Sequence, residues 1–333
     1  MKKEIFMKVT IFAILALVVT MFTTPAWAAK TLRITLQLPI KHHLGANLIS
    51  FKEEVNRESG GSLEVKIYPS AQLYKDKEVP QAVSSGAIEM GVASLSQFAG
   101  TIPAVDLFYV PFLLPSYDKV VKATQYDSPI RRSIDAEILK TGARTLWWQA
   151  YGGVVLLSKD FAVRMPDDLK GKKIRVFGKM LGEFAKAVGA APTVMSGSKQ
   201  FLAYQRGTVD AGMTGITAVK PRKLDQVMNY ATITNHADIE FLVLINEKTW
   251  QGLSKKEQQV LVTAARRVEK ELRGKIQSLE ADALAYAKEH MKVTELGSKE
   301  IAAWQEATKS VEKIYIQNSG PLGAELVEAA KAL

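Results

Sequence analysis

Residues 172–195, KKIRVFGKMLGEFAKAVGAAPTVM, decide the fold class of this chain. Within this stretch, residues 172–177 have the pattern of a strand, 180–188 that of a helix and 193–195 that of a short strand. A strand, a helix and a strand in this order predict parallel pairing through a crossover helix. The stretch therefore predicts an α/β fold.

The same alternation extends on both sides of this stretch. Further strands are predicted at 31–38, 63–68, 88–93, 144–151, 154–158, 209–214 and 239–246, and further helices at 46–58, 79–85, 199–206 and 220–227. The strands 144–151 and 154–158 are separated by Gly152-Gly153. Two rounds of strands and helices in a chain this long predict two α/β domains with a cleft between them.

The C-terminal third has helical patterns. Ser254 and Glu257 form a capping box, after which apolar residues recur every three or four positions to about His290. This pattern predicts one long helix, which either couples closure of the two domains or serves only as a packing helix. Shorter helices are expected at 299–316 and 322–333. Domain I is predicted to comprise 29–152 and about 240–279, and domain II 153–239 and about 280–333.

The N-terminus has the pattern of a secretory signal peptide. A basic start precedes an apolar run at 9–22 and the sequence Ala26-Trp27-Ala28. That run is shorter than the ~20 apolar residues that span a bilayer, so cleavage near Ala28/Ala29 is favoured over a retained anchor. We therefore expect a signal peptide at 1–28 and an exported, periplasmic protein. It contains no cysteine, so packing alone must stabilise it.

The charge pattern indicates an anionic partner. The net charge is +10, and removing residues 1–28 lowers it to +8, because Lys2, Lys3 and Lys8 outnumber Glu4 there. An excess of positive charge attracts anions. The basic residues are spread along the chain and interleaved with acids, so we expect no nucleic-acid binding.

Signatures of catalysis are missing from the sequence. The four histidines show no metal-ligand spacing, and neither HExxH nor Gly-x-Ser-x-Gly occurs. We therefore expect no enzyme activity, no cofactor and no metal. A secreted α/β hydrolase, the competing class, would need a nucleophile–base pair that the sequence does not offer.

Arg175 is the sharpest candidate for a binding residue. It lies inside an otherwise apolar strand, where an unpaired charge is costly. Either an acid elsewhere in the fold pairs with it, or its guanidinium receives the carboxylate of a ligand. Nearby, Trp147 and Trp148 should point to opposite faces of their strand. We expect one of them, with Tyr151, to reach the cleft, and Trp148 is the candidate.

Five ordered motifs carry a resemblance to a known family. They are 68–73 (YPSAQL), 110–114 (VPFLL), 166–176 (PDDLKGKKIRV), 189–192 (GAAP) and 207–210 (GTVD). Together they resemble the DctP-type substrate-binding subunits of tripartite ATP-independent periplasmic (TRAP) transporters. The resemblance runs through essentially the whole chain after the signal peptide.

This resemblance implies a periplasmic binding protein-like fold, in which two α/β domains close on a ligand cleft like a clam and a long helix spans both domains. Such receptors pass a small organic acid anion to a small four-helix and a large multi-helix membrane subunit, driven by an ion gradient. The resemblance also implies that Arg175 pairs with the ligand carboxylate. By aligned position, it adds to the predicted site Gln37, Asp76, Ser94, Gln97 and Thr214.

Two departures from the family pattern concern specificity. Many members have a second arginine where this chain has Val154-Val155, and often a Phe where it has Gly197. The sequence thus predicts a pocket that has lost a positive charge and a ring, with Val155 and Gly197 facing the ligand. A monocarboxylate with an apolar or aromatic body is favoured. The alternatives are a C4-dicarboxylate, a sulfonate, or a receptor that serves a sensor instead of a transporter.

Overall fold

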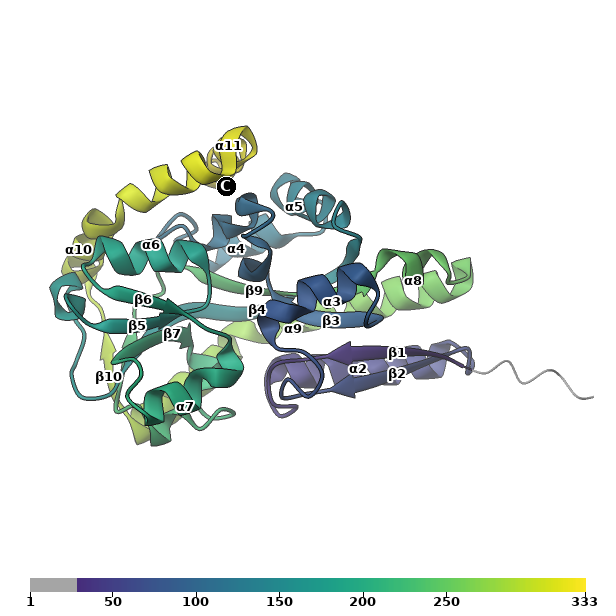
Figure 1. The fold of residues 1–333 in the computed structure, drawn as a ribbon, viewed down its shortest axis with the longest axis horizontal. Coiled ribbons are helices and arrows are strands. Elements are labelled where there is room, and N and C mark those ends of the chain that lie inside the picture. Colours follow the sequence, from purple (N-terminus) through teal and green to yellow (C-terminus); the bar gives the residue numbers. More distant parts are fainter. Residues whose placement is uncertain (1–28) are drawn as a thin grey trace, which may run out of the picture.

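The computed structural model describes residues 29–333, so the predicted signal peptide lies outside the described residues. Figure 1 shows an elongated α/β molecule. Its strands are β1 (Lys30–Thr35), β2 (Leu63–Tyr68), β3 (Met90–Ser94), β4 (Ala143–Ser158), β5 (Lys173–Val176), β6 (Ala191–Val194), β7 (Ala211–Gly215), β8 (Tyr230–Ile233), β9 (Asp238–Asn246) and β10 (Lys292–Glu295).

Helices cover the strands on both faces. They are α2 (His43–Glu58), α3 (Val79–Ser85), α4 (Tyr117–Thr124), α5 (Pro129–Leu139), α6 (Lys179–Ala187), α7 (Gln200–Gln205), α8 (Glu247–Gln251), α9 (Lys255–His290), α10 (Ser298–Thr308) and α11 (Ser310–Lys331). Short 3₁₀ segments are η2 (Asp76–Glu78), η3 (Leu95–Phe98), η4 (Pro103–Tyr109), η5 (Pro166–Leu169), η6 (Gly197–Lys199), η7 (Ile216–Ala218) and η8 (Leu224–Gln226).

The strands pair in the order β2-β1-β3-β9-β4-β7-β5-β6, with β8 pairing both β4 and β10. The pairs β1–β2, β1–β3, β5–β6 and β5–β7 are parallel, whereas β9 runs antiparallel to β3 and β4. Parallel strands joined by helices confirm the α/β architecture predicted from residues 172–195.

One strand is shared by both halves of the molecule. β4 pairs with β9 as far as Gly153. Its residues 154–158 then pair with β7, and residues 156–158 also pair with β8 on the other side. The prediction of two separate strands was therefore wrong, because Gly152-Gly153 lies inside a continuous strand. Gly152 adopts φ +110°, and its register with β9 shifts there. The Gly153 N–H donates to Glu280 Oε1 of α9 at 2.8 Å.

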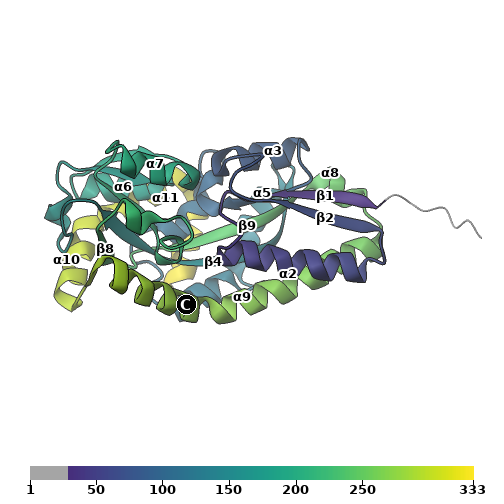
Figure 2. The same ribbon diagram turned by 90° about the horizontal axis from the view of Figure 1, so that it is seen from below.

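The long helix predicted to about His290 is confirmed as α9, a helix of 36 residues. The Ser254 hydroxyl accepts a hydrogen bond from the Glu257 N–H, and the Glu257 carboxylate accepts one from the Ser254 N–H. Figure 2 shows α9 running along the molecule beneath both sets of strands. It packs on α2 and β4 in one half and on η7 and β10 in the other. Whether it couples domain closure stays a prediction.

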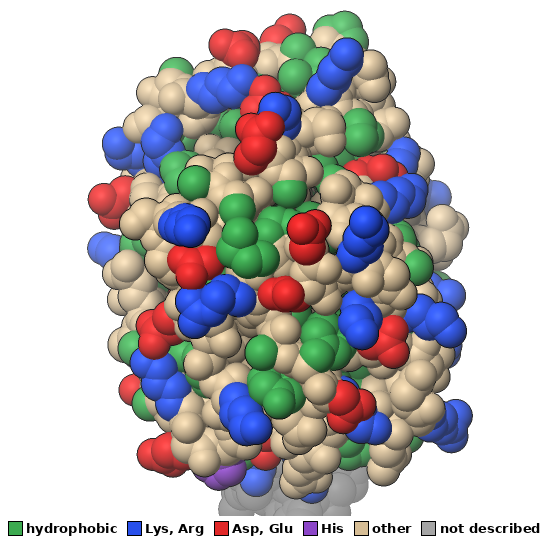
Figure 3. All heavy atoms as spheres, turned by 90° about the vertical axis from the view of Figure 1, so that its left-hand side faces the viewer, with side chains coloured by type: hydrophobic (Ala, Val, Ile, Leu, Met, Phe, Trp, Pro, Cys, Tyr) green, Lys and Arg blue, Asp and Glu red, His purple; other side chains and the backbone are tan. Residues whose placement is uncertain are grey.

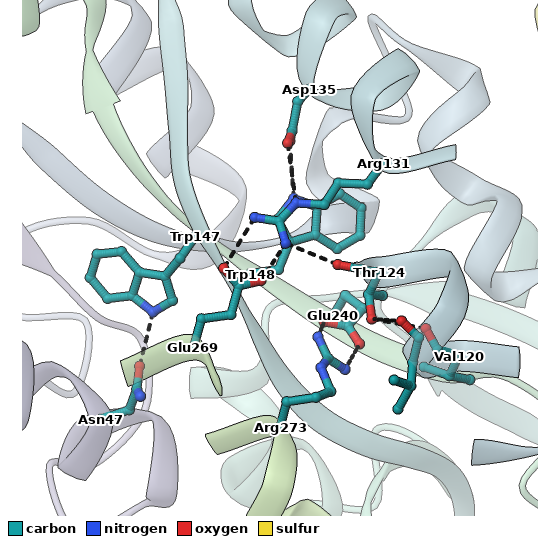
Figure 4. A network of polar contacts seen from close by, with 11 residues as sticks. Asn47, Val120, Thr124, Arg131, Asp135, Trp147, Trp148, Glu240, Glu269 and Arg273 are labelled. Carbon is teal, nitrogen blue, oxygen red and sulfur yellow. Dashed lines mark hydrogen bonds and ion pairs between the residues drawn. The ribbon is translucent and has the colours of Figure 1, made fainter. Parts of the chain in front are cut away.

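Buried ion pairs attach α9 to its neighbours (Figure 4). Arg131 of α5 binds the Glu269 carboxylate with two nitrogens and donates to the Thr124 carbonyl at 2.9 Å. Arg273 binds both oxygens of the Glu240 carboxylate on β9, which is fully buried. Paired guanidinium and carboxylate groups satisfy each other inside the protein, so these contacts fix α9 in register with the sheet.

Trp147 and Trp148 point to opposite faces of β4, as the alternation of a strand predicts. The Trp147 indole donates to the Asn47 side chain of α2 at 3.0 Å, and that of Trp148 donates to Asp135 of α5 at 3.0 Å (Figure 4). Both rings are fully buried. Trp148 is therefore a core residue held by α5, and the expectation that it reaches the cleft is not met.

Some predicted elements differ from the structure. Residues 220–227 form only the short segment η8, because Pro221 interrupts helical hydrogen bonding and Lys223 has φ +56°. The helix expected at 299–316 ends at Thr308, and α11 then continues through a kink at Gly320. The sequence patterns also did not predict α4, α5, α8, β8 and β10. Within residues 29–333 no helix is long and apolar enough to cross a membrane.

We predict that Gly152→Ala destabilises the protein by about 1–3 kcal/mol more than Gly60→Ala does, because a φ near +110° is essentially confined to glycine. An added Cβ at Gly152 would also lie 2.3 Å from Glu280 Oε1 and displace the carboxylate that binds Gly153. Gly60 is the control, since its φ is +59° and no atom lies within 4 Å of such a Cβ. Urea unfolding of both variants measures the difference, and equal losses would contradict a special role for Gly152.

Candidate functional site

A small cavity lies between the two halves, with about 260 Å³ of space that protein atoms do not fill. Strands and loops from both sheets form its walls, and most of the side chains that line it are polar. The lining residues are Gln37, Asp76, Ser94, Tyr151, Arg175, Phe177, Gly197, Gln200, Thr214, Arg222, Ile239 and Phe241. A buried, polar cavity between two lobes is a candidate ligand site.

Seven residues predicted from the sequence meet in this cavity. They are Gln37, Asp76, Ser94, Tyr151, Arg175, Gly197 and Thr214. They come from distant parts of the chain, and parallel pairing brings several of the strand ends to one edge. Among the lining residues, Phe177, Gln200, Arg222, Ile239 and Phe241 were not singled out by the sequence analysis.

Arg175 of β5 is 2% exposed and lines the cavity. Its Nε and Nη2 donate to the Met195 carbonyl at 3.1 and 2.8 Å, and its Nη1 donates to the Met213 carbonyl at 2.6 Å. Burial lowers its pKa to about 10. Within residues 29–333 the arginines that form ion pairs do not include Arg175, so the salt-bridge interpretation is not what the structure shows.

The Arg175 guanidinium therefore has N–H groups left over that can bind a ligand. A guanidinium carries five N–H groups in a planar fork, and three hydrogen bonds to two carbonyls leave about two of them. The carbonyls fix the plane of the fork without neutralising its charge. This arrangement suits an anion that enters the cavity and accepts two parallel hydrogen bonds.

Arg222 is a second guanidinium in the cavity, and it comes from the loop between η7 and η8. Its Nη2 donates to Gln37 Oε1 at 3.3 Å, while its Nε is buried with no hydrogen-bond partner. Burial lowers its pKa. The sequence patterns did not single out this residue, because they predicted only a helix at 220–227 and gave no reason for Arg222 to leave its surface.

Arg222 corrects the expectation that the pocket has lost a positive charge. Val154 and Val155, which occupy the place of the family's second arginine, are buried in β4 and do not line the cavity. Val155 instead pairs with Thr214 across the β4–β7 ladder. The positive charge is present, but a different part of the chain supplies it.

Gly197 explains how Arg222 fits. A Cβ at Gly197 would lie 2.9 Å from both Arg222 Nη2 and Gln37 Oε1. The space left by the missing side chain is therefore filled by the polar ends of these two residues. Gly197 lines the cavity, but the space that a ring at this position would fill is occupied by Arg222 and Gln37.

Asp76, in η2, is the acidic residue among those that line the cavity. One of its oxygens accepts from the Ser94 N–H at 2.9 Å and the other from the Ser94 hydroxyl at 2.7 Å. Burial raises the pKa of Asp76 to about 6, although the hydrogen bonds from Ser94 and the charges of Arg175 and Arg222 oppose the shift. The cavity thus holds two guanidinium groups and one carboxylate.

Gln97 does not line this cavity. Its amide donates to the Phe177 carbonyl at 2.8 Å and to the Ser94 hydroxyl at 3.2 Å. The Ser96 hydroxyl donates to the same Phe177 carbonyl at 3.1 Å. η3 is thereby attached to the segment that follows Arg175, and Gln97 joins the two halves instead of facing the cavity.

Aromatic rings form the apolar side of the cavity. Tyr151 stacks on Phe241 with ring centroids 5.2 Å apart, and on its other side lies His42 at 5.0 Å. The Phe177 ring lies 5.2 Å from the Arg175 guanidinium carbon. These rings exclude water from the charged groups, which strengthens any ion pair formed inside.

Among residues 29–333, no group of three or more histidines or acids is arranged to hold a metal ion. Basic and acidic side chains are interspersed on the end of the molecule that carries α10 and β10 (Figure 3). That face shows no continuous basic surface.

Comparisons with known proteins agree on one family. The family model for "Bacterial extracellular solute-binding protein, family 7" (DctP) matches residues 37–318. The chain is 29% identical over 293 residues to the C4-dicarboxylate-binding periplasmic protein DctP of Rhodobacter capsulatus, covering 86% of each chain.

Two solved structures are similar at 25% sequence identity, each with a TM-score of 0.84. One is a TRAP periplasmic solute-binding protein from Sulfurospirillum deleyianum with bound succinate, and the similarity covers 91% of this chain and 98% of that one. The other is from Ralstonia eutropha with bound (S)-2-acetolactate, covering 91% and 99%. These likenesses confirm the periplasmic binding protein-like fold.

We predict that Asp76→Asn stabilises the ligand-free protein at about pH 7 by roughly 2–3 kcal/mol. A pKa raised from 3.8 to about 6 means that the ionised carboxylate destabilises the folded state by this amount, and the variant removes that carboxylate. A carboxyl whose pKa is higher in the folded state favours folding while protonated. The gain from the variant should therefore be full above about pH 6 and disappear below about pH 4. Urea unfolding of both proteins across this range measures it. A gain that does not depend on pH would contradict the assigned shift.

Proposed function

Since this chain belongs to the DctP family of bacterial extracellular solute-binding proteins, the substrate-binding subunits of TRAP transporters, we propose that it captures a small organic acid anion and delivers it to the membrane subunits. The family is a transport receptor family. We propose that the chain is exported by cleavage near Ala28/Ala29 and works in the periplasm, with a small four-helix and a large multi-helix membrane subunit as partners.

One observation carries the assignment of the site. Arg175 is buried at the cavity between the two halves, two backbone carbonyls orient its guanidinium, and the described ion pairs leave it without an acid. A buried cation without a counter-ion is costly, and a ligand carboxylate would remove that cost. The lining residues Gln37, Ser94, Tyr151, Gln200 and Thr214 are proposed to bind the polar atoms of the ligand.

The domain division follows from the same geometry. We propose that domain I comprises 29–152 with about 240–279, and domain II the remainder, so that the chain crosses between them at Gly152-Gly153. The pairing of β4 with β9 before this point and with β7 and β8 after it supports this division. Opening and closing about these glycines would admit and enclose the ligand.

We propose further that the favoured ligand is a monocarboxylate with an apolar or aromatic body. The sequence-based reasons, Val155 and Gly197, no longer support this choice. The support comes instead from the charges, because Asp76 offsets Arg222 and leaves Arg175 for one carboxylate. Phe177, Ile239 and Phe241 offer an apolar surface.

Other ligands and roles make different predictions. A C4-dicarboxylate is the principal alternative, since the similar proteins include receptors named for dicarboxylates or solved with succinate. A sulfonate could also use the fork of Arg175. A role as receptor for a sensor would be favoured if the gene were not accompanied by genes for TRAP membrane subunits.

The first experiment is a calorimetric comparison of acids. Monocarboxylates with an apolar or aromatic body should bind more tightly than succinate, malate or fumarate, because a second carboxylate would exceed the net charge of the cavity. A thermal-shift screen selects the panel, since a ligand at 100 times its Kd adds about 2.7 kcal/mol of stability. Equal or tighter binding of dicarboxylates would refute the monocarboxylate proposal and leave the transport function standing.

The second experiment tests Arg175. Arg175→Ala should weaken binding by roughly two to four orders of magnitude, because breaking a buried ion pair costs about 3–5 kcal/mol. Arg175→Lys should also bind poorly, since an ammonium cannot form the planar fork. The exposed Arg206→Ala serves as the control for net charge.

Melting of the ligand-free variants separates the two interpretations of Arg175. Removing the side chain breaks its hydrogen bonds to the Met195 and Met213 carbonyls but also removes a buried charge, so the two effects oppose each other. We expect a modest change in melting temperature. Near-normal affinity together with a large loss of stability would show that Arg175 is structural.

A further inference from the structure

Asp76 places a negative charge in a cavity that is proposed to bind an anion. Its carboxylate is 1% exposed and lines the same cavity as Arg175 and Arg222. Neither arginine forms an ion pair with it within 4 Å, so it is a separate charge in the cavity. A buried carboxylate repels an anionic ligand, so its presence in a proposed anion site calls for a functional explanation.

We infer that Asp76 sets the charge of the ligand. Resting on the function proposed above, the inference is that a monoanion binds while Asp76 stays ionised, and that a dianion binds only when Asp76 takes up one proton from solvent. With Asp76 ionised the two guanidinium groups leave a net charge of one positive unit, which one carboxylate balances. With Asp76 protonated the net charge is two, which a dicarboxylate balances.

The groups around Asp76 come from several elements. Arg175 of β5 and Arg222 of the loop before η8 bring positive charge. The phenols of Tyr109, Tyr151 and Tyr204, from η4, β4 and α7, interact with Asp76 or with these arginines. Burial raises the pKa of all three, that of Tyr204 to about 12, so they remain neutral.

Asp76 is therefore the group lining the cavity that can change charge near neutral pH. Its burial raises its pKa to about 6, whereas a delocalised guanidinium stays protonated at neutral pH, and burial lowers the pKa of Arg175 only to about 10. The proton would remain on the carboxyl and leave the hydrogen bond from the Ser94 N–H intact. A protonated Asp76 can also donate a hydrogen bond to a second carboxylate of the ligand.

A matched pair of ligands tests the inference on the unmodified protein. Fumarate and trans-but-2-enoate share a planar four-carbon skeleton, but the first carries two carboxylates and the second carries one. Calorimetry in buffers of different ionisation enthalpy counts the protons taken up on binding. We expect about one proton for fumarate and none for trans-but-2-enoate at about pH 7.

The pH dependence should differ in the same way. Above about pH 6, uptake of one proton makes fumarate affinity fall by up to tenfold per pH unit. The affinity for trans-but-2-enoate should stay constant there, because Asp76 is ionised before and after binding. Both acids are fully ionised in this range, so their own titration does not contribute.

Asp76→Asn removes the titrating group and keeps its shape. In this variant, proton uptake with fumarate should vanish. The ratio of fumarate to trans-but-2-enoate affinity should rise about tenfold at about pH 7. In the unmodified protein Asp76 has to be protonated about one pH unit above its pKa before fumarate binds, and the variant no longer bears that cost. Asp127→Asn, in an exposed turn, changes the net charge equally and should leave the ratio unchanged.

The outcomes separate this inference from the proposed function. Binding of fumarate to the unmodified protein without proton uptake, or an unchanged affinity ratio in Asp76→Asn, would overturn the role of Asp76 and leave carboxylate transport intact. Failure of every carboxylate to bind would overturn the proposed function and this inference with it.

Discussion

The Arg175 guanidinium is enclosed by protein, two backbone carbonyls orient it, and the described acids leave its charge unpaired. Keeping a charge out of water without a counter-ion costs free energy. The carbonyls of Met195 and Met213 reduce this cost because they supply partial negative charge. The strands on both sides of β5 hold the guanidinium in place against these carbonyls. An anion of the right shape recovers that free energy, so the least favourable feature of the empty cavity becomes the source of affinity.

The cavity depends on how the two halves are joined. β4 belongs to both sets of strands, and at its Gly152-Gly153 pair the register with β9 shifts and the φ of Gly152 is +110°. α9 lies along both halves, and its Glu280 carboxylate binds the Gly153 N–H at the crossing. Gln97 and Ser96 attach the other side by donating to the Phe177 carbonyl. The walls of the cavity therefore have a defined spacing even though they come from different sheets.

The electrostatics of the cavity arise from three side chains that are distant in sequence. Arg175 is oriented by carbonyls, Arg222 by the Gln37 side chain, and Asp76 by Ser94. Each orienting group is itself neutral, so the charges act on one another and on a ligand across a region that contains little water. We propose that the balance of these charges, more than the size of the cavity, distinguishes one organic acid from another.

The sequence by itself determined the α/β class and the long capped helix after Ser254, because each rests on local pattern. It also singled out Arg175 as a charge inside an apolar strand, but it left open whether an acid of the protein or a ligand pairs with that charge. The bounds of β2 and α3 follow from alternation and from flanking turn residues. Only the tertiary structure decided that β4 is continuous, that Trp148 is held by Asp135, and that Arg222 fills the space beside Gly197. These outcomes depend on contacts between segments far apart in the chain, and no local pattern records which distant side chain will occupy a given volume.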